Sequence, residues 1–282
     1  GAANPGCPVP AVRIDQFNAE PLDVLTLDAR PSQGAVRYRW TVLVRPDGST
    51  SEPAESHANQ TPDDPATPAA EFFVDLAGEY TLALEVEAAD GTTSPGPGCP
   101  AEARVEVIAV PTQAIHLQLV WHTPDDPDET DDQGSDMDIH LRHPTAAAWS
   151  VAPLDCYYAN KTPDWGPAGL AGDPSLDIDD LDGAGPENIN IDRPEATAPL
   201  GGPYRLAVHV WSLVPQGLGS PWGPSTATVR VYYSGELVRE VERELVTKND
   251  LWEVARLHWG AAAADRRVEL VGTVEVHDPS GF

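Results

Sequence analysis

Between positions 173 and 192 the chain concentrates carboxylate and amide side chains more densely than anywhere else in the sequence. Hard cations such as Ca²⁺ are bound by roughly six to eight oxygens, often from a loop bent by glycine. Gly183, Gly185 and Pro186 provide such a bend here. The oxygen donors of this stretch are Asp177, Asp179, Asp180, Asp182, Glu187 and Asn188. The stretch therefore predicts a calcium site, and the alternative is an acidic loop that is only solvated.

The spacing excludes an EF-hand. If Gly183 is aligned with the invariant glycine of an EF-hand loop, Ile178 stands where the first aspartate ligand belongs. The predicted calcium loop is therefore of a different type.

A second group of ligands is predicted on a short strand, Asp136–Leu141. Apolar residues at its second, fourth and sixth positions alternate with polar ones, and side chains of a strand alternate between its faces. Asp136, Asp138 and His140 therefore share one face. If this strand lies beside the acidic stretch, its two aspartates would complete the site. Carboxylates at this density repel one another unless a cation or solvent screens them, which favours a bound cation. The alternative is an ordinary solvated sheet face.

Catalytic motifs are absent from the sequence, which has no Gly-x-Ser-x-Gly elbow, P-loop or dinucleotide fingerprint. The eight histidines and three cysteines form no compact set with the spacing of a zinc site. Paired carboxylates can hydrolyse glycosides, but nothing singles out one pair among so many. We therefore expect a protein that is not an enzyme.

The charge balance excludes whole classes of partner. Forty-five acidic residues stand against 17 basic ones, a net charge of −28. Phosphate binding depends on lysine and arginine, so nucleic acid and anionic lipid are not expected as partners. The sequence also has no apolar run of about 20 residues, so no transmembrane helix is predicted.

The chain is predicted to be all-β, with two tandem β-sandwich domains at 1–110 and 111–282. The 29 prolines and 23 glycines are spread along the chain and leave room for short strands rather than long helices. Period-two alternation of apolar and polar residues marks the strands, and Asp-Gly pairs follow two of them. Ser49–Ala70 is poor in apolar residues and is predicted to be a surface loop. Strands are predicted at 38–44, 80–87, 115–122, 136–141, 204–211, 228–233, 236–246, 251–259 and 268–277.

Residues 12–110 resemble the PKD-type Ig-like domains of bacterial surface proteins. The likeness lies in YRWTV at 38–42, DGS at 47–49 and LAGEYTL at 76–82, although the usual WDFGDG stretch is missing. The resemblance implies a buried Trp40 and a role as a spacer or adhesion module. In an Ig-like sandwich the first and last strands are close together, so a Cys7–Cys99 disulfide is expected, and with it an oxidising compartment and export. Cys156 would then be a small buried hydrophobic residue.

Residues 115–260 resemble the YfaP-like family of secreted bacterial β-domains, to which many myxobacterial lipoproteins are similar. Three segments in the same order carry the likeness: GSDMDIHLRHP at 134–144, LDIDDLDGAGPEN at 176–188 and YRLAVHV at 204–210. The resemblance implies a secreted sandwich of jelly-roll type. It implies no particular activity.

Trp165 and Trp222 each begin a Trp-Gly-Pro tripeptide in a predicted loop. Exposed aromatic rings on a rigid β-scaffold can stack on sugars, because they offer a large rigid apolar face. The alternative is that both rings close the ends of the sandwich.

The expected protein is thus an exported envelope or surface protein with a structural or adhesive role and calcium-stabilised acidic loops. One alternative is a carbohydrate-binding surface module that uses the loop tryptophans, and another is a subunit of a surface filament or motility-associated assembly. A surface polysaccharide or other envelope proteins are the expected partners. Export places the protein in the periplasm, on the cell surface or outside the cell, and any lipid anchor would be carried by a leader preceding Gly1.

Overall fold

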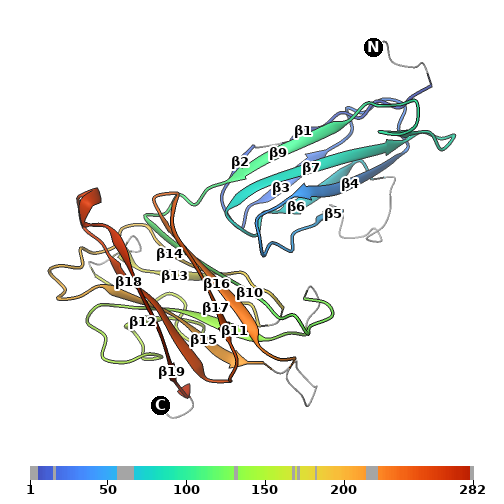
Figure 1. Cartoon of the computed structure of the whole chain (residues 1–282). Coiled ribbons are helices and arrows are strands. Elements are labelled where there is room, and N and C mark those ends of the chain that lie inside the picture. Colours follow the sequence, from blue (N-terminus) through green and yellow to red (C-terminus); the bar gives the residue numbers. More distant parts are fainter. Residues whose placement is uncertain are drawn as a thin grey trace. The chain divides into compact units, whose positions relative to one another are not determined.

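The computed structural model describes residues 6–14, 17–55, 67–129, 133–166, 169, 172–181, 183–213 and 222–279. The chain divides into two compact units, Gly1–Val110 and Pro111–Phe282 (Figure 1). Short strands make up both units, and helical geometry in the described residues is limited to brief 3-10 turns such as Ala263–Asp265. Within this described part no helix has the length and apolar character needed to cross a membrane. The all-β prediction is confirmed.

The amino-terminal unit consists of two sheets, with strand orders β1-β3-β6-β5 and β2-β9-β7-β4, and β8 pairs with β7. Its strands are β1 (Arg13–Ile14), β2 (Asn18–Ala19), β3 (Val24–Asp28), β4 (Arg37–Val44), β5 (Pro53–Glu55), β6 (Ala69–Phe73), β7 (Gly78–Glu87), β8 (Thr93–Ser94) and β9 (Ala103–Ala109). Strand pairs are antiparallel except β2 with β9. Leu25, Phe72 and Leu82 belong to the core that fills this unit. The predicted loop at 49–70 contains β5 and the start of β6, and 56–66 lies outside the described residues.

Tyr80 fixes a corner of this unit near the start of β7. Its hydroxyl donates to Oδ1 of Asp75 at 2.7 Å and accepts a hydrogen bond from the backbone N–H of Leu76 at 2.9 Å. This arrangement matches the tyrosine corner of Ig-like sandwiches. Trp40 is only half-buried rather than buried as expected, because β4 is the edge strand of its sheet.

Cys7 and Cys99 form a disulfide whose Cα atoms are 5.4 Å apart. The bond joins the start of the amino-terminal unit to the segment that precedes its last strand. Cys156 is a buried free thiol in the carboxy-terminal unit.

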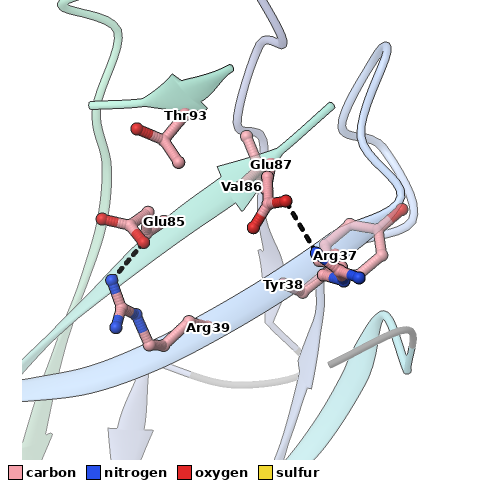
Figure 2. A pocket seen from close by; sticks show the side chains of 7 residues that line it. All are labelled: Arg37, Tyr38, Arg39, Glu85, Val86, Glu87 and Thr93. Atoms are coloured by element: carbon pink, nitrogen blue, oxygen red, sulfur yellow. Dashed lines mark hydrogen bonds and ion pairs between the residues drawn. The ribbon is translucent and has the colours of Figure 1, made fainter. Parts of the chain in front are cut away.

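Cross-strand ion pairs line a surface pocket of about 440 Å³ on β4 and β7 (Figure 2). Nη1 of Arg37 lies 2.7 Å from Oε1 of Glu87, and Arg39 pairs with Glu85 in the same way. Each charge is thus neutralised within the pocket. The pocket therefore points to no ligand of its own.

The carboxy-terminal unit also has two sheets, with orders β13-β14-β10-β16-β17 and β12-β11-β15-β18-β19. Its strands are β10 (Ile115–His122), β11 (Asp136–Arg142), β12 (Asp155–Cys156), β13 (Ser175–Ile178), β14 (Glu187–Ile191), β15 (Tyr204–Ser212), β16 (Ser225–Tyr233), β17 (Glu236–Leu245), β18 (Asp250–His258) and β19 (Arg267–Val276). All ladders are antiparallel. Leu117, Ile139 and Val208 lie in the core cluster, to which both sheets contribute.

The acidic stretch at 173–192 is not a single loop, because it contains β13 and β14, which pair with each other. The loop between them is bent at Gly183 and Gly185, whose φ angles of 95° and 88° are left-handed. A Cβ on Gly185 would lie 3.1 Å from the carbonyl oxygen of Leu119, so glycine is needed for this close approach. The bend returns the chain into β14 and places Glu187 at its first position.

Candidate metal centre

The polar side chains of β11 are buried. Asp136, Asp138 and His140 share the face opposite to the core, as predicted, but they are only 8%, 3% and 0% exposed. The alternative of a solvated face is wrong, because aromatic residues from the segment after β11 cover it. The imidazole of His140 is stacked on Tyr157 at 4.9 Å and lies edge-on to Trp149 at 6.1 Å between ring centroids.

Three carboxylates meet beside this face: Asp138 from β11, Asp179 directly after β13 and Glu187 from the start of β14. One carboxylate oxygen from each lies within 4.8 Å of the other two. We call these three residues the acidic cluster. Asp138 and Glu187 are buried, and Asp179 is half-buried. Since β11 and β14 belong to different sheets, the acidic cluster lies where the two sheets of this unit approach each other.

Glu187 is the most deeply buried member of the acidic cluster. Its Oε2 accepts a hydrogen bond from the backbone N–H of Ile139 at 2.5 Å, whereas its buried Oε1 accepts none. Burial raises the pKa of Glu187 well above its ordinary value, and the nearby charge of Asp138 raises it further. A cation at the acidic cluster would oppose both effects and allow this carboxyl group to ionise.

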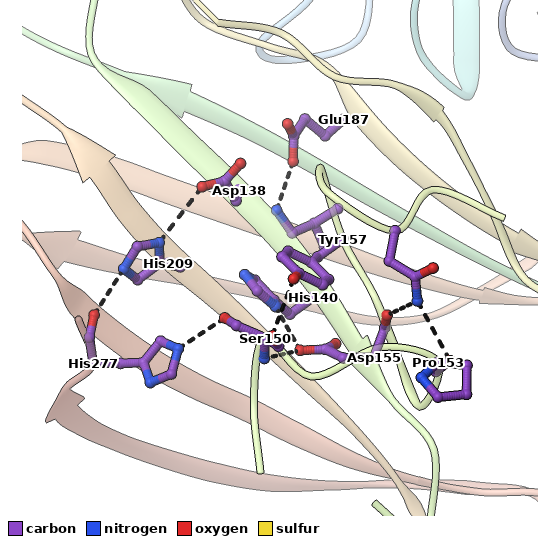
Figure 3. A network of polar contacts seen from close by, with 11 residues as sticks. Asp138, His140, Ser150, Pro153, Asp155, Tyr157, Glu187, His209 and His277 are labelled. Carbon is purple, nitrogen blue, oxygen red and sulfur yellow. Dashed lines mark hydrogen bonds and ion pairs between the residues drawn. The ribbon is translucent and has the colours of Figure 1, made fainter. Parts of the chain in front are cut away.

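Two positive or protonatable groups face the acidic cluster from its sides. Nζ of Lys161 lies 2.8 Å from Oδ2 of Asp179, and this lysine side chain is 47% exposed. Nδ1 of His209 lies 3.5 Å from Oδ2 of Asp138 (Figure 3). Asp136 adds a further carboxylate close enough to affect the pKa of Glu187. Among the described residues joined by these contacts, four are carboxylates, and only Lys161 and His209 are basic.

A buried polar network holds β11 in place beside the acidic cluster (Figure 3). Nδ1 of His140 is 2.9 Å from Oδ2 of Asp155, and the backbone N–H of Ser150 donates to the same oxygen at 2.6 Å. The hydroxyl of Ser150 lies 2.8 Å from Nε2 of His277. Burial lowers the pKa of His140, but the Asp155 carboxylate outweighs this effect and raises it. The network fixes the segment that covers β11.

The other predicted ligands lie elsewhere. Oδ1 of Asp177 accepts a hydrogen bond from the hydroxyl of Ser175 at 2.7 Å, and Asp177 lines a separate surface pocket of about 490 Å³. Asn188 is paired with Gln118 in the sheet and faces away from Glu187, because neighbouring residues of a strand alternate. Asp180 is in the loop after Asp179 but not in the acidic cluster. Asp182 lies outside the described residues.

Of the two alternatives for Trp165, the exposed ring is excluded. Its side chain is 2% exposed, and its Nε1–H donates to the carbonyl oxygen of Pro153 at 2.7 Å. Its ring is stacked on Tyr204 at a centroid distance of 6.0 Å. Trp165 therefore fills the interior, as the alternative stated, and Trp222 is half-buried.

Two aromatic residues near the acidic cluster were not singled out as a site from the sequence. Trp211 is 37% exposed at the end of β15, and the ring of Tyr158 lies 5.3 Å from it. Strand alternation places Trp211 on the same face as Arg205 and His209, away from the core, and this signal could have identified it.

Neither a protein-family model nor a curated protein sequence matches this chain. Among solved structures, it is weakly similar to the adhesin InvE of Yersinia pseudotuberculosis. That match has 11% sequence identity and a TM-score of 0.24, and it covers 94% of this chain and 72% of the adhesin. Similarity at this level carries no argument about function. The resemblances to PKD-type and YfaP-like domains stay predictions.

Proposed function

We propose that this chain is a non-enzymatic module of a bacterial envelope or surface protein, with a structural or adhesive role, and that calcium bound at the acidic cluster stabilises its carboxy-terminal unit. One observation carries the metal assignment. Glu187 is fully buried among other carboxylates, and its Oε1 has no hydrogen-bond donor. A buried charged group without a partner is costly, so a cation is the partner that this site lacks.

The donor set fits calcium. All three side chains of the acidic cluster offer oxygen, which suits a hard cation, and none offers the sulfur or imidazole nitrogen typical of zinc sites. Calcium accepts roughly six to eight oxygens in flexible geometry, with carboxylates binding through one or both oxygens. Magnesium requires near-octahedral geometry and retains much of its water, which fits an enclosed carboxylate cluster less well.

The position of the acidic cluster suggests what a bound ion would do. Asp138 belongs to one sheet and Glu187 to the other, so an ion held by both would tie the sheets together. Ligands that bind only the folded state stabilise it by mass action. Calcium outside the cell would therefore keep this unit folded.

Export is supported by the Cys7–Cys99 disulfide, since structural disulfides form mainly in oxidising compartments. Blocking free thiols in intact native cells before extraction tests this part of the proposal. Mass spectrometry should find Cys7 and Cys99 unalkylated and joined. Full alkylation of both cysteines would place the protein in a reducing compartment.

Isothermal titration of the chelator-treated protein with calcium chloride tests the metal role. We expect one site per chain, which Asp138→Asn or Asp179→Asn weakens strongly. The matched control is Glu236→Gln, which removes an exposed carboxylate at the start of β17. If wild type takes up no calcium, or if the control weakens binding as much as the cluster variants, the assignment fails.

A second role, as a subunit of a filament, is favoured by the edge strand β19. Leu270, Val274 and Val276 are 49%, 36% and 79% exposed on this strand. Open edges that carry apolar side chains can pair with another chain. Sedimentation velocity over a range of concentrations should then reveal assembly, and a monomer at every concentration would exclude this role.

A further inference from the structure

Trp211 and Tyr158 form an aromatic surface on the outside of the carboxy-terminal unit, which we call the aromatic platform. Trp211 is 37% exposed, and its ring centroid is 5.3 Å from that of Tyr158, with the two planes tilted by 58°. Tyr158 also contacts Tyr157 edge-on at 5.2 Å. Since Tyr157 is stacked on the buried His140, the aromatic platform rests on a fixed layer of rings.

A cationic group borders the aromatic platform. Nζ of Lys248 lies 5.8 Å from the ring centroid of Trp211. Asp136 is the register partner of Ser212, the residue that follows Trp211, but its side chain is buried. The pKa of Tyr158 is raised by its burial and then by the charges of Asp138 and Asp136, so the carboxylates lie within electrostatic reach of its ring. The aromatic platform is therefore an apolar face with a charged border.

We propose that the aromatic platform binds a neutral polysaccharide, with one pyranose ring stacked on Trp211. A pyranose has an apolar face of C–H groups that matches an aromatic ring, and its hydroxyls lie around the edge. Those hydroxyls would meet the ammonium group of Lys248 beside the ring. Tryptophan and tyrosine provide such contacts at low entropic cost, because their side chains are rigid.

Other occupants fit this surface less well. A wholly apolar partner would bury the ammonium group of Lys248 without a hydrogen bond, which is unfavourable. Polyanions and anionic lipid surfaces are repelled by a net charge of −28. A neutral polymer of hydroxylated rings can stack on the aromatic rings and also offer hydroxyl groups to Lys248.

This binding goes beyond the proposed calcium role and does not require it. Neither Trp211 nor Tyr158 is a member of the acidic cluster. Sugar binding can therefore be measured with and without calcium, and the two proposals can fail separately.

Affinity electrophoresis in native gels that contain laminarin, xylan or galactomannan tests the proposal. Wild-type protein should be retarded by at least one of the three polymers. Trp211→Ala should weaken that retardation about tenfold or more, as expected for a central aromatic contact. Lys248→Met should weaken it less, and it leaves both rings intact in case the tryptophan variant folds poorly. Thermal unfolding of each variant checks that it is folded.

Two controls make the result specific. Phe73→Ala removes an aromatic side chain of matched exposure, 38%, from the amino-terminal unit and should leave retardation unchanged. Trp222→Ala should also leave it unchanged. The proposal is overturned if no polymer retards the wild type, if folded Trp211→Ala and Lys248→Met both bind as wild type does, or if Trp222→Ala alone abolishes binding.

Discussion

Glu187 and Ile139 connect the two sheets of the carboxy-terminal unit through one hydrogen bond. The backbone N–H of Ile139 in β11 donates to Oε2 of Glu187 in β14 at 2.5 Å. The other carboxylate oxygen of Glu187 is buried and lacks a donor. The same side chain therefore joins the sheets and offers an oxygen to a cation.

The variant Glu187→Gln separates these two roles. In chelator we expect it to unfold at the same urea concentration as wild type or a higher one, because the amide keeps an acceptor for Ile139 and replaces a carboxyl group whose charged form is disfavoured by burial and by Asp138. At a hundredfold excess of calcium over its dissociation constant, wild type should gain about 2.7 kcal/mol. The variant should gain little of this. An equal calcium response in both proteins would show that Glu187 does not bind the ion.

Lys161 is expected to compete with calcium for Asp179. Its exposed ammonium group contributes at most about 1 kcal/mol to stability through this ion pair. Lys161→Met should therefore change stability in chelator only slightly, but it should tighten calcium binding about threefold to tenfold at low salt. Arg239→Met, which removes an exposed charge from β17, is the control. Weaker calcium binding in the lysine variant would contradict this role.

The Cys7–Cys99 disulfide is expected to stabilise the amino-terminal unit alone. It links residues 92 positions apart. On the chain-entropy account a loop of this size gives about 4–5 kcal/mol. Differential scanning calorimetry of Cys7→Ala/Cys99→Ala should show a lower unfolding temperature for the amino-terminal unit and an unchanged one for the carboxy-terminal unit. Tryptophan fluorescence can follow the carboxy-terminal unit separately, because seven of the eight tryptophans lie in 111–282. A uniform shift of both transitions would contradict this expectation.

Tyr80→Phe should destabilise the amino-terminal unit by about 1–2 kcal/mol at neutral pH, because Asp75 and Leu76 lose their hydrogen bonds to the hydroxyl. Burial, with the charge of Asp75, raises the pKa of Tyr80 above its ordinary value of 10.0. Above pH 10 the unfolded chain would lose this proton and the folded chain would keep it, so stability should fall as pH rises further. Urea unfolding at several alkaline pH values should show a weaker pH dependence for the phenylalanine variant, whereas Tyr38→Phe should behave as wild type does.

Much of the strand pattern could be predicted from the sequence, because period-two alternation depends only on which face is buried. The strand predicted at 115–122 agrees with β10 at both ends. The predicted ranges leave out β1–β3, β5, β6, β8, β9 and β12–β14, among them the short strands of the acidic stretch. In β5, β13 and β14, proline and acidic residues interrupt the alternation of polar and apolar residues. Pairing with a neighbouring strand, rather than local preference, makes these segments strands.

The candidate site could be predicted only in part. Alternation alone placed Asp136, Asp138 and His140 on one face, but burial of that face depends on the covering segment, which sequence periodicity does not reveal. The register shift between Leu176 and Ile178 falls at Asp177 and determines which aspartate joins Glu187. Such a bulge has no simple sequence signal. The sequence left two alternatives for Trp165, because the burial of a loop residue depends on tertiary packing.

The most direct test of the account is thermal unfolding of the wild-type chain in EDTA, in millimolar calcium and in millimolar magnesium. Calorimetry should resolve the transition of the carboxy-terminal unit in each case. We expect calcium to raise this transition by several degrees, magnesium to raise it much less, and the amino-terminal transition to stay constant. An identical carboxy-terminal transition in EDTA and in calcium would contradict the central claim that the acidic cluster is a calcium site.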